Sequence, residues 1–264
     1  MPVILWFNDL PLWQTGLLIT FGAMLVSIVG TAVARLFFAE QQLGLNNIVG
    51  GFQYMFLSQV YAGFIGFLLF GVYDRFDQVR VDMVTEVSAL TSLDRLAVAF
   101  PERTQGQIRT SIRDYARAVV DIDWPQMQNR SGIVSTIPAL DDLEYLFGAI
   151  ETTSKKQREI VKLSRELVTS VRNDRAQRLF RSYGTLVGPL WAAALLAMAM
   201  AIVLPWVFGT PNVNADLLMS MLTVVMMASI VLVVLKLSYP FGGSSGLPPD
   251  AFAAFAGQPS GRGG

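Results

Sequence analysis

Four polar side chains interrupt an otherwise apolar run of the sequence between residues 48 and 72. They are Gln53, Ser58, Gln59 and Tyr61. A polar group inside a bilayer is costly unless it faces protein or water, so these side chains need partners. Two interpretations remain open: hydrogen bonds between neighbouring helices, or the lining of a water-filled path. Amide donors carry no negative charge, so such a path would suit an anion.

If this run is a helix, two neighbouring faces of it could line a path. One carries Gln53, Phe56, Val60, Phe64 and Phe67, and the other carries Phe52, Gln59, Gly63, Gly66 and Phe70. Repeated around a ring, the apolar side chains of the first face would form a constriction that closes by dewetting. Backbone amides at the start of the helix, at its positive dipole end, would add donors. The candidate lining residues are Asn46, Asn47, Gln53, Phe56, Gln59, Val60 and Phe64. The alternative is that both faces only pack against other helices.

The apolar residues of the whole chain form two pairs of membrane-length segments. The segments are Leu12–Phe38, Ile48–Val72, Leu186–Phe208 and Leu217–Leu237. Each has the ~20 apolar residues that a helix needs to cross a ~30 Å hydrocarbon core. Hydrophobic residues make up 53% of the chain and charged residues only 15%, which disfavours an ordinary soluble protein. The lipid bilayer is therefore the first expected partner.

Charge is concentrated between the two pairs of segments. Of the 20 Lys and Arg residues, 17 lie between Arg75 and Arg181, and of the 20 Asp and Glu residues, 16 lie between Asp74 and Asp174. We therefore predict that the middle of the chain is a domain exposed to water, with nearly balanced charge. It offers no strongly basic surface, so we expect no nucleic-acid partner.

Several kinds of chemistry are excluded by composition. The chain has no cysteine and no histidine, so it has no disulfides, thiol nucleophiles, histidine-based triads or zinc sites of the usual kind. No phosphate-binding glycine motif follows a strand pattern. We expect no enzyme, no cofactor and no metal site.

The charged middle shows helical periodicity and no strand pattern, so we predict an all-α fold. The second apolar segment should continue as one long helix to Phe100, because its apolar face goes on through Phe76, Val79, Met83, Val87 and Leu90. Pro101 should end it. The next predicted helix buries the stripe Ile108, Ile112, Tyr115, Val119 and Ile122 and closes at Trp124-Pro125. A loop should cover 129–138. Two further helices should bury Leu140, Leu143, Phe147 and Ile150, and then Ile160, Leu163, Leu167 and Val171.

Two clusters of acidic residues each allow a structural and a functional interpretation. Asp74, Asp77, Asp82 and Glu86 leave the second apolar segment together. We favour a solvated face paired with Arg75 and Arg80 over a cation-selecting mouth. Asp121, Asp123, Asp141, Asp142 and Glu144 form a second acidic neighbourhood. We favour helix capping and surface charge there over a bound divalent ion, because no EF-hand pattern is present.

The basic residues predict the topology. Four spans place both termini and the charged middle on one side, where Arg75, Arg80, Arg172, Arg175, Arg178, Arg181 and Lys236 lie near the span ends. The opposite side has only Arg35, so that side is external and the middle is cytoplasmic. We predict spans one and two in 1–72, a helical cytoplasmic domain in 73–183, spans three and four in 184–238, and a partly disordered tail in 239–264.

Scattered motifs add a family resemblance over nearly the whole chain. They are Asn46-Asn47 with Gly50 or Gly51, Tyr73-Asp74-Arg75-Phe76-Asp77, Glu86 with Ala89-Leu90, Tyr115 with Val119-Val120, Trp124-Pro125, Pro240-Phe241-Gly242 and Pro248-Pro249-Asp250-Ala251-Phe252. In this order and spacing, the chain resembles the bestrophin-like family of bacterial membrane proteins, a family of unknown function. Two positions depart from the family pattern: Tyr73 stands where Trp is frequent, and Ser238 stands where Asp is frequent.

The resemblance implies an analogy with true bestrophins. Those are pentameric anion channels with four spans, a large helical cytoplasmic part and a pore lined by the second span. By this analogy we expect a homo-oligomeric, bestrophin-like channel for chloride or another small anion, in the inner (plasma) membrane. The alternative is a non-conducting scaffold or accessory subunit whose cytoplasmic helices dock a partner. Because fold does not fix function, both hypotheses stay open.

Overall fold

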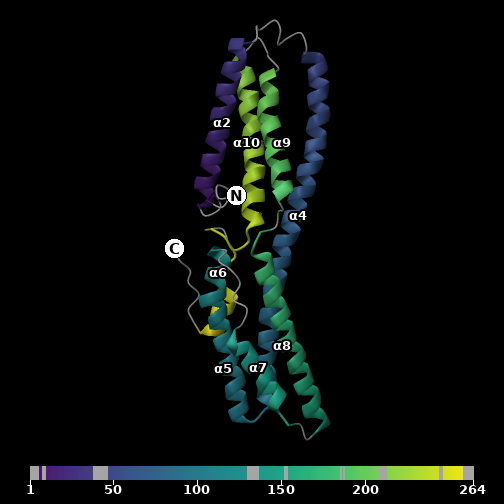
Figure 1. The fold of residues 1–264 in the computed structure, drawn as a ribbon, viewed down its shortest axis with the longest axis vertical. Helices are drawn as coiled ribbons and strands as arrows, with labels where there is room; N and C mark the ends of the chain where they lie inside the picture. The colour runs from purple at the N-terminus through teal and green to yellow at the C-terminus, as the bar shows by residue number, and fades with distance from the viewer. Residues whose placement is uncertain are drawn as a thin grey trace. The chain divides into compact units, whose positions relative to one another are not determined.

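The chain folds into helices that form two compact units. The computed structural model describes residues 6–7, 10–37, 47–129, 137–151, 154–184, 186, 188–207, 213–243 and 246–257. No strand occurs in these ranges, so the fold is all-α as the sequence predicts. Figure 1 shows the order of the helices along the chain. One unit, the apolar unit, takes in residues up to Arg75 and Thr185–Tyr239; the other, the charged unit, is built from Phe76–Gly184 and most of the C-terminal segment.

The apolar unit contains the membrane-length helices. They are α2 (Leu12–Phe37), the first part of α4 (Asn47–Leu96), α9 (Gly188–Val207) and α10 (Val213–Ser238). Three apolar helices, Leu12–Phe37, Gly50–Ala99 and Leu217–Ser238, are long enough to cross a membrane by length and composition, and Gly188–Leu204 is a shorter apolar stretch. Pro189 lies in the first turn of α9, where its missing N–H costs no helical hydrogen bond.

Within the apolar unit, α2, α9 and α10 pack against one another. Gly30 of α2 permits a close approach, because a Cβ atom there would lie 2.0 Å from the indole ring of Trp206. The part of α4 in this unit joins at its C-terminal end, where Leu68 and Val72 pack with Trp191 and Val234. Only 11% of the most apolar stretch of α4 is buried, against 22% for α2 and α10. α4 therefore leaves a large face uncovered by its own chain.

The charged unit has one core. Its helices are the rest of α4, a 3₁₀ turn at Ala97–Ala99, α5 (Glu102–Ala118), a π-helical turn η2 (Val119–Asp123), α6 (Trp124–Asn129), α7 (Pro138–Ala149), α8 (Lys155–Arg181) and α11 (Asp250–Ala256). The core is mostly aliphatic and aromatic side chains from all these helices, with Leu90, Leu93, Ile108, Ile112, Leu143, Phe147, Phe241 and Phe252 essentially inaccessible.

Local chemistry sets the helix ends in this unit. Ser154 caps α8, since its Oγ accepts a hydrogen bond from the backbone N–H of Gln157 at 3.1 Å. Pro138 stands in the first turn of α7. Gly257 follows α11 with φ 71°, a left-handed conformation that glycine adopts without strain.

Two sequence predictions about helix faces were wrong. The buried stripe was expected to include Ile122, but Ile122 is exposed and Asp123 is buried instead. The reason is that the π-helical turn adds one residue to the helix at that point. For the same reason Trp124-Pro125 does not close the helix but starts α6. On α8 the buried face is Val161, Ser164, Val168 and Val171, so Leu163 is exposed.

Candidate functional site

The candidate lining residues of α4 lie on its uncovered face. Gln53, Phe56, Gln59 and Val60 are all exposed, with Phe56 71% and Val60 56% accessible. At 3.6 residues per turn, Gln59 and Phe56 point away from Leu68, which packs into the apolar unit, whereas Gln53 and Val60 lie on the flank of α4. Two amides therefore lie unpacked within a membrane-length apolar run.

The other candidates on α4 differ from these four. Phe64 is half-buried and packs against the cluster of Leu68 and Trp191, so it belongs partly to the unit's own packing. Asn47 is the first residue of α4, but its side chain lies outside the described part of the structure, as does the whole of Asn46. Their role stays a prediction.

Two of the polar residues noted first in the sequence have neighbouring helices. The Tyr61 hydroxyl donates to Met200 Sδ of α9 at 3.2 Å, which fits the interpretation of contact between helices. Ser58 borders a cavity between α4 and α10. The polar content of this run is therefore divided between packing and the uncovered face.

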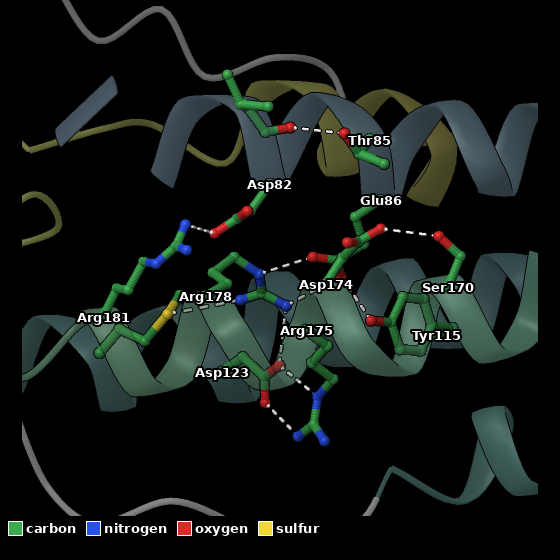
Figure 2. Close-up of polar contacts among 12 residues, drawn as sticks. Asp82, Thr85, Glu86, Tyr115, Asp123, Ser170, Asp174, Arg175, Arg178 and Arg181 are labelled. Atoms are coloured by element: carbon green, nitrogen blue, oxygen red, sulfur yellow. Dashed lines mark hydrogen bonds and ion pairs between the residues drawn. The ribbon is translucent and has the colours of Figure 1, made fainter. Parts of the chain in front are cut away.

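A buried ionic network holds the charged unit together (Figure 2). The guanidinium of Arg178 on α8 donates to both carboxylate oxygens of Glu86 on α4, from Nε at 2.9 Å and from Nη2 at 3.1 Å. The Tyr115 hydroxyl of α5 donates to the same carboxylate at 2.6 Å. Both charged side chains are 0% exposed. Three helices therefore meet at one carboxylate.

A second carboxylate extends this network. Asp123 of the π-helical turn accepts two hydrogen bonds from Arg175, each at 2.9 Å, and one from Arg178 at 3.2 Å. Two arginines and two carboxylates thus compensate one another in a water-excluded site. The π-helical turn is what brings Asp123 inward to face α8.

Aromatic rings cover the central arginine. The Arg178 guanidinium carbon lies 5.7 Å from the ring centroid of Trp124 and 5.3 Å from that of Phe252 on α11, within cation–π range. Trp124 donates from Nε1 to the carbonyl of Leu247 at 3.2 Å, and Phe241 contacts its ring edge-on. The C-terminal segment is therefore part of the enclosure around Arg178.

The electrostatics keep these groups in fixed protonation states. Burial raises the pKa of Tyr115 well above its usual value of 10.0, and the Glu86 carboxylate raises it further. Burial alone would lower the pKa of Arg178, but the charge and hydrogen bonds of Glu86 outweigh it and raise that pKa above its usual value. Tyr115 therefore keeps its proton and Arg178 its charge, and the buried network joins α4, α5 and α8.

Two further carboxylates, Asp82 and Asp174, lie at the edge of the buried ionic network, and their negative charges are less fully compensated by neighbouring groups. Asp82 pairs with Arg181, yet burial raises its pKa, an effect that Arg181 only partly offsets. Burial likewise raises the pKa of Asp174, against the lowering effect of a hydrogen bond from Ser170 at 3.2 Å. Asp82 raises the Asp174 pKa further, since two like charges face each other.

The favoured interpretation of the acidic residues needs correction for Glu86 and Asp123, which are buried in ion pairs rather than solvated. Asp77 does pair with Arg80, at 3.7 Å and in solvent. Asp141 and Glu144 accept hydrogen bonds from Arg172 at 2.8 and 2.9 Å. In the described ranges no three acidic side chains come close enough together to hold a metal ion.

The sequence did carry a signal for the buried network. Glu86 lies three residues after Met83 and four before Leu90, both on the predicted apolar face of the long helix. Arg175 and Arg178 continue the spacing of Val168 and Val171 on α8. Their place near the span ends predicts membrane-flanking charges, but the structure buries both arginines. Charged residues in register with an apolar stripe are a signature of buried ion pairs when both signs occur.

The helices, the uncovered face of α4 and the charged unit together define an all-helical membrane protein of the bestrophin type. The family model for the bestrophin-like domain matches residues 21–252, and the chain belongs to this family. No curated protein matches significantly.

Solved structures agree on the fold. A bacterial bestrophin homologue from Klebsiella pneumoniae, crystallised as a point variant, superimposes with a TM-score of 0.71 at 14% identity, covering 91% of this chain and 97% of that one. A second variant of that homologue gives a TM-score of 0.68 at 14% identity, over 90% of this chain and 99% of that one. A crystal structure described as a membrane protein variant gives 0.70 at 14% identity, over 90% and 97%. At this identity the likeness concerns the fold.

Proposed function

We propose that this protein is a homo-oligomeric ion channel in which α4 of each copy faces a central axis. The observation that carries this proposal is the exposure of Gln53 and Gln59 on a membrane-length apolar helix. Lipid tails cannot hydrogen-bond to an amide, so a lipid-facing position is unfavourable for both side chains. Around an axis, the same amides would face water or a neighbouring copy.

The uncovered face of α4 supplies both parts of a gated path. Gln53 offers amide donors toward the start of the helix, while Phe56 and Val60 follow one and two turns later with most of their side chains exposed. In a ring these apolar side chains form a constriction that excludes water when narrow. Ring closure would also cover the large apolar face that α4 leaves open.

Anions are the expected permeant species. No Asp or Glu stands in the apolar run of α4 between Asn47 and Tyr73, so no ring of fixed negative charge opposes an anion there. Asn46, Asn47 and Gln53 would supply uncharged donors, and chloride is the simplest candidate. The analogy with true bestrophins favours a pentamer.

We assign the charged unit to the cytoplasm. The sequence has seven basic residues near the span ends on the side of the charged unit and one, Arg35, on the other side. By the positive-inside rule, both termini and the charged unit would lie on the cytoplasmic side of the inner (plasma) membrane.

The test is conduction by purified protein in planar bilayers. With a chloride gradient, the reversal potential should follow the chloride equilibrium potential. Val60→Ser should raise the current severalfold, because a hydroxyl at the constriction favours wetting. Val29→Ser, at a 52% exposed position of α2, is the matched control and should leave the current unchanged.

Other outcomes have defined meanings. A reversal potential that follows the cation gradient would overturn the assignment of anions as the permeant ions, but the proposal that the protein is a channel would stand. Silent bilayers containing an intact oligomer would overturn the channel in favour of a non-conducting scaffold.

A further inference from the structure

Two tryptophans are exposed at one end of the apolar unit. Trp13, in the first turn of α2, is 65% exposed, and Trp6 is 55% exposed. Trp6 meets Phe7 edge-on, with ring centroids 5.1 Å apart, and Phe7 packs against the cluster of Val72 and Val234. Each indole is therefore held at a defined level of the unit while more than half of its surface stays uncovered.

Charged residues begin at the same end of the unit on the two neighbouring helices. Lys236, near the end of α10, donates from Nζ to the carbonyl of Leu10 at 2.8 Å, just before α2 begins. On α4 the first charged residue is Asp74, two positions after Val72, which packs with Val234 of α10. A charged side chain belongs in water or among headgroups, so this level marks one boundary of the hydrocarbon core.

Two packed helices give the same thickness for that core. On α2, Trp13 and Arg35 are 22 positions apart, which is about 33 Å at 1.5 Å per residue. On α10, which packs against α2, Asn214 and Lys236 are also 22 positions apart. Both lengths match a ~30 Å hydrocarbon core and put the end residues at the headgroup level. Trp13 therefore lies at the boundary between hydrocarbon and headgroups, where tryptophan is enriched.

The rest of the outer face of α2 decides between lipid and a second copy of the chain. Helices that associate in a membrane approach through small residues, because lipid tails are as apolar as the side chains that would replace them. On α2 the small residues are instead buried within the apolar unit: Ala23, Ser27, Gly30 and Thr31. The exposed side chains between the two ends are mostly bulky: Leu17, Leu18, Phe21, Leu25, Val26, Ile28, Val29 and Val33.

The exposed face of α4 has the opposite character, since it carries Gly63 and Gly66 beside the amide of Gln59. That face has the small and polar residues that contacts between copies use, and α2 does not. Lipid is therefore the partner that fits the outer face of α2 and the two tryptophans at its end.

We propose that Trp6 and Trp13 form an interfacial anchor that binds the phospholipid headgroup layer, with the outer face of α2 against the acyl chains. The indole suits this level because its ring is apolar and its N–H can donate to a phosphate or ester oxygen. The anchor requires that the apolar unit lies in a bilayer, but it does not require ion conduction. Failure of the channel and failure of the anchor are therefore separate outcomes.

Depth-dependent fluorescence quenching tests the level of each indole. The full-length protein is reconstituted into phosphatidylcholine and phosphatidylglycerol liposomes whose acyl chains carry bromine either near the carboxyl end or near the methyl end. Because the chain has five tryptophans, the signal of Trp13 is the difference between the wild type and Trp13→Phe, and Trp6→Phe gives that of Trp6 in the same way. Both signals should be quenched roughly threefold more by bromine near the carboxyl end, which lies closer to the headgroups.

A tryptophan moved along the same face of α2 is the matched control. Leu25 is 64% exposed and lies 12 positions, or about 18 Å, from Trp13, near the middle of the hydrocarbon core. Leu25→Trp in the Trp13→Phe chain should reverse the preference and respond more strongly to bromine near the methyl end. Phe21→Trp, at a 65% exposed position, replaces Leu25→Trp if that variant fails to assemble.

Three results would overturn the proposal. The first is a Trp13 signal that neither brominated lipid quenches, which would show that a second copy covers this end of α2. The second is stronger quenching of Trp13 or Trp6 by bromine near the methyl end, which would place that indole inside the core. The third is the same depth preference for Trp13 and for the tryptophan of the Leu25→Trp variant.

Discussion

At the scale of residues, the buried network is the feature with the largest energetic consequences. Arg178 is fully buried and receives its compensating charge from Glu86 and Asp123. A buried charge that loses its partner costs far more than the pair contributes, because desolvation is then uncompensated. The network therefore acts less as a source of stability than as a condition for one arrangement of α4, α5 and α8.

We predict that Glu86→Gln lowers the stability of the charged unit by about 3–5 kcal/mol, because it leaves the Arg178 charge without its bidentate partner. Tyr115→Phe removes one hydrogen bond to the same carboxylate and should cost about 1–3 kcal/mol. Thermal unfolding in detergent measures both, with Glu102→Gln on the exposed first turn of α5 as the control. A Glu86→Gln variant that melts like the wild type would show that the pair is not formed.

A second residue-scale prediction concerns Asp174. Its pKa in the folded protein is raised by burial from 3.8, so the folded state favours the protonated form. The resulting stabilisation is complete below about pH 3.8 and is lost as the pH rises through the raised pKa. Asp174→Asn should thus raise the melting temperature at pH 7 and change it little at pH 4. Asp142→Asn, at an exposed position, serves as the control at both pH values. An effect of Asp174→Asn that is equal at the two pH values would contradict this mechanism.

At the scale of elements, periodicity predicted the existence and type of the helices, but it failed where the helix geometry itself changes. The long helix through Val79, Met83 and Leu90 is present, and it ends at Leu96 with a 3₁₀ turn before Pro101. The stripe on α5 holds through Val119 and then fails at Ile122, because a π-helical turn shifts the register by one residue. Such a shift depends on what the following residues pack against, which no local pattern contains.

The candidate site divides in the same way. Gln53, Phe56, Gln59 and Val60 are exposed, as lining residues would have to be, but so is most of this stretch of α4, and their role stays a prediction. The ion pairs between α4, α8 and the π-helical turn could not be predicted, because the sequence separations of 92 residues for Glu86–Arg178 and 52 for Asp123–Arg175 leave partner choice to the tertiary fold.

The C-terminal segment gives the prediction at this scale. Residues 240–257 supply Phe241 and Phe252 to the core and accept the Trp124 indole hydrogen bond through Leu247. Truncation after Tyr239 should expose these core positions, lower the melting temperature of the charged unit by several degrees and make α5 and α6 sensitive to protease. Truncation after Gly257 keeps every one of these contacts and should behave like the full chain. Equal protease resistance of the two truncated forms would contradict a structural role for this segment.

At the scale of the whole molecule, the fold persists at 14% identity with the bacterial bestrophin homologue. The fold can persist at such low identity because it needs only a few sequence features: membrane-length apolar runs, a helical charged unit and buried charges that compensate one another. The face of α4 that its own chain leaves open is different, because its residues are free of intrachain packing constraints at Phe56 and Val60. Selection for a conduction path or for subunit contacts would act on this face.

Oligomer geometry provides the last prediction. If α4 of each copy surrounds an axis, Phe56→Cys brings identical cysteines of neighbouring copies together, and a disulfide forms when their Cα atoms approach within about 7 Å. Mild oxidation of native membranes should then give a covalent dimer on a non-reducing gel for Phe56→Cys. Leu25→Cys, at a 64% exposed position of α2, should stay monomeric because that face meets lipid. The cysteine-free background makes either band unambiguous. Dimers from Leu25→Cys but not from Phe56→Cys would place α2 at the contact between copies and remove α4 from the axis.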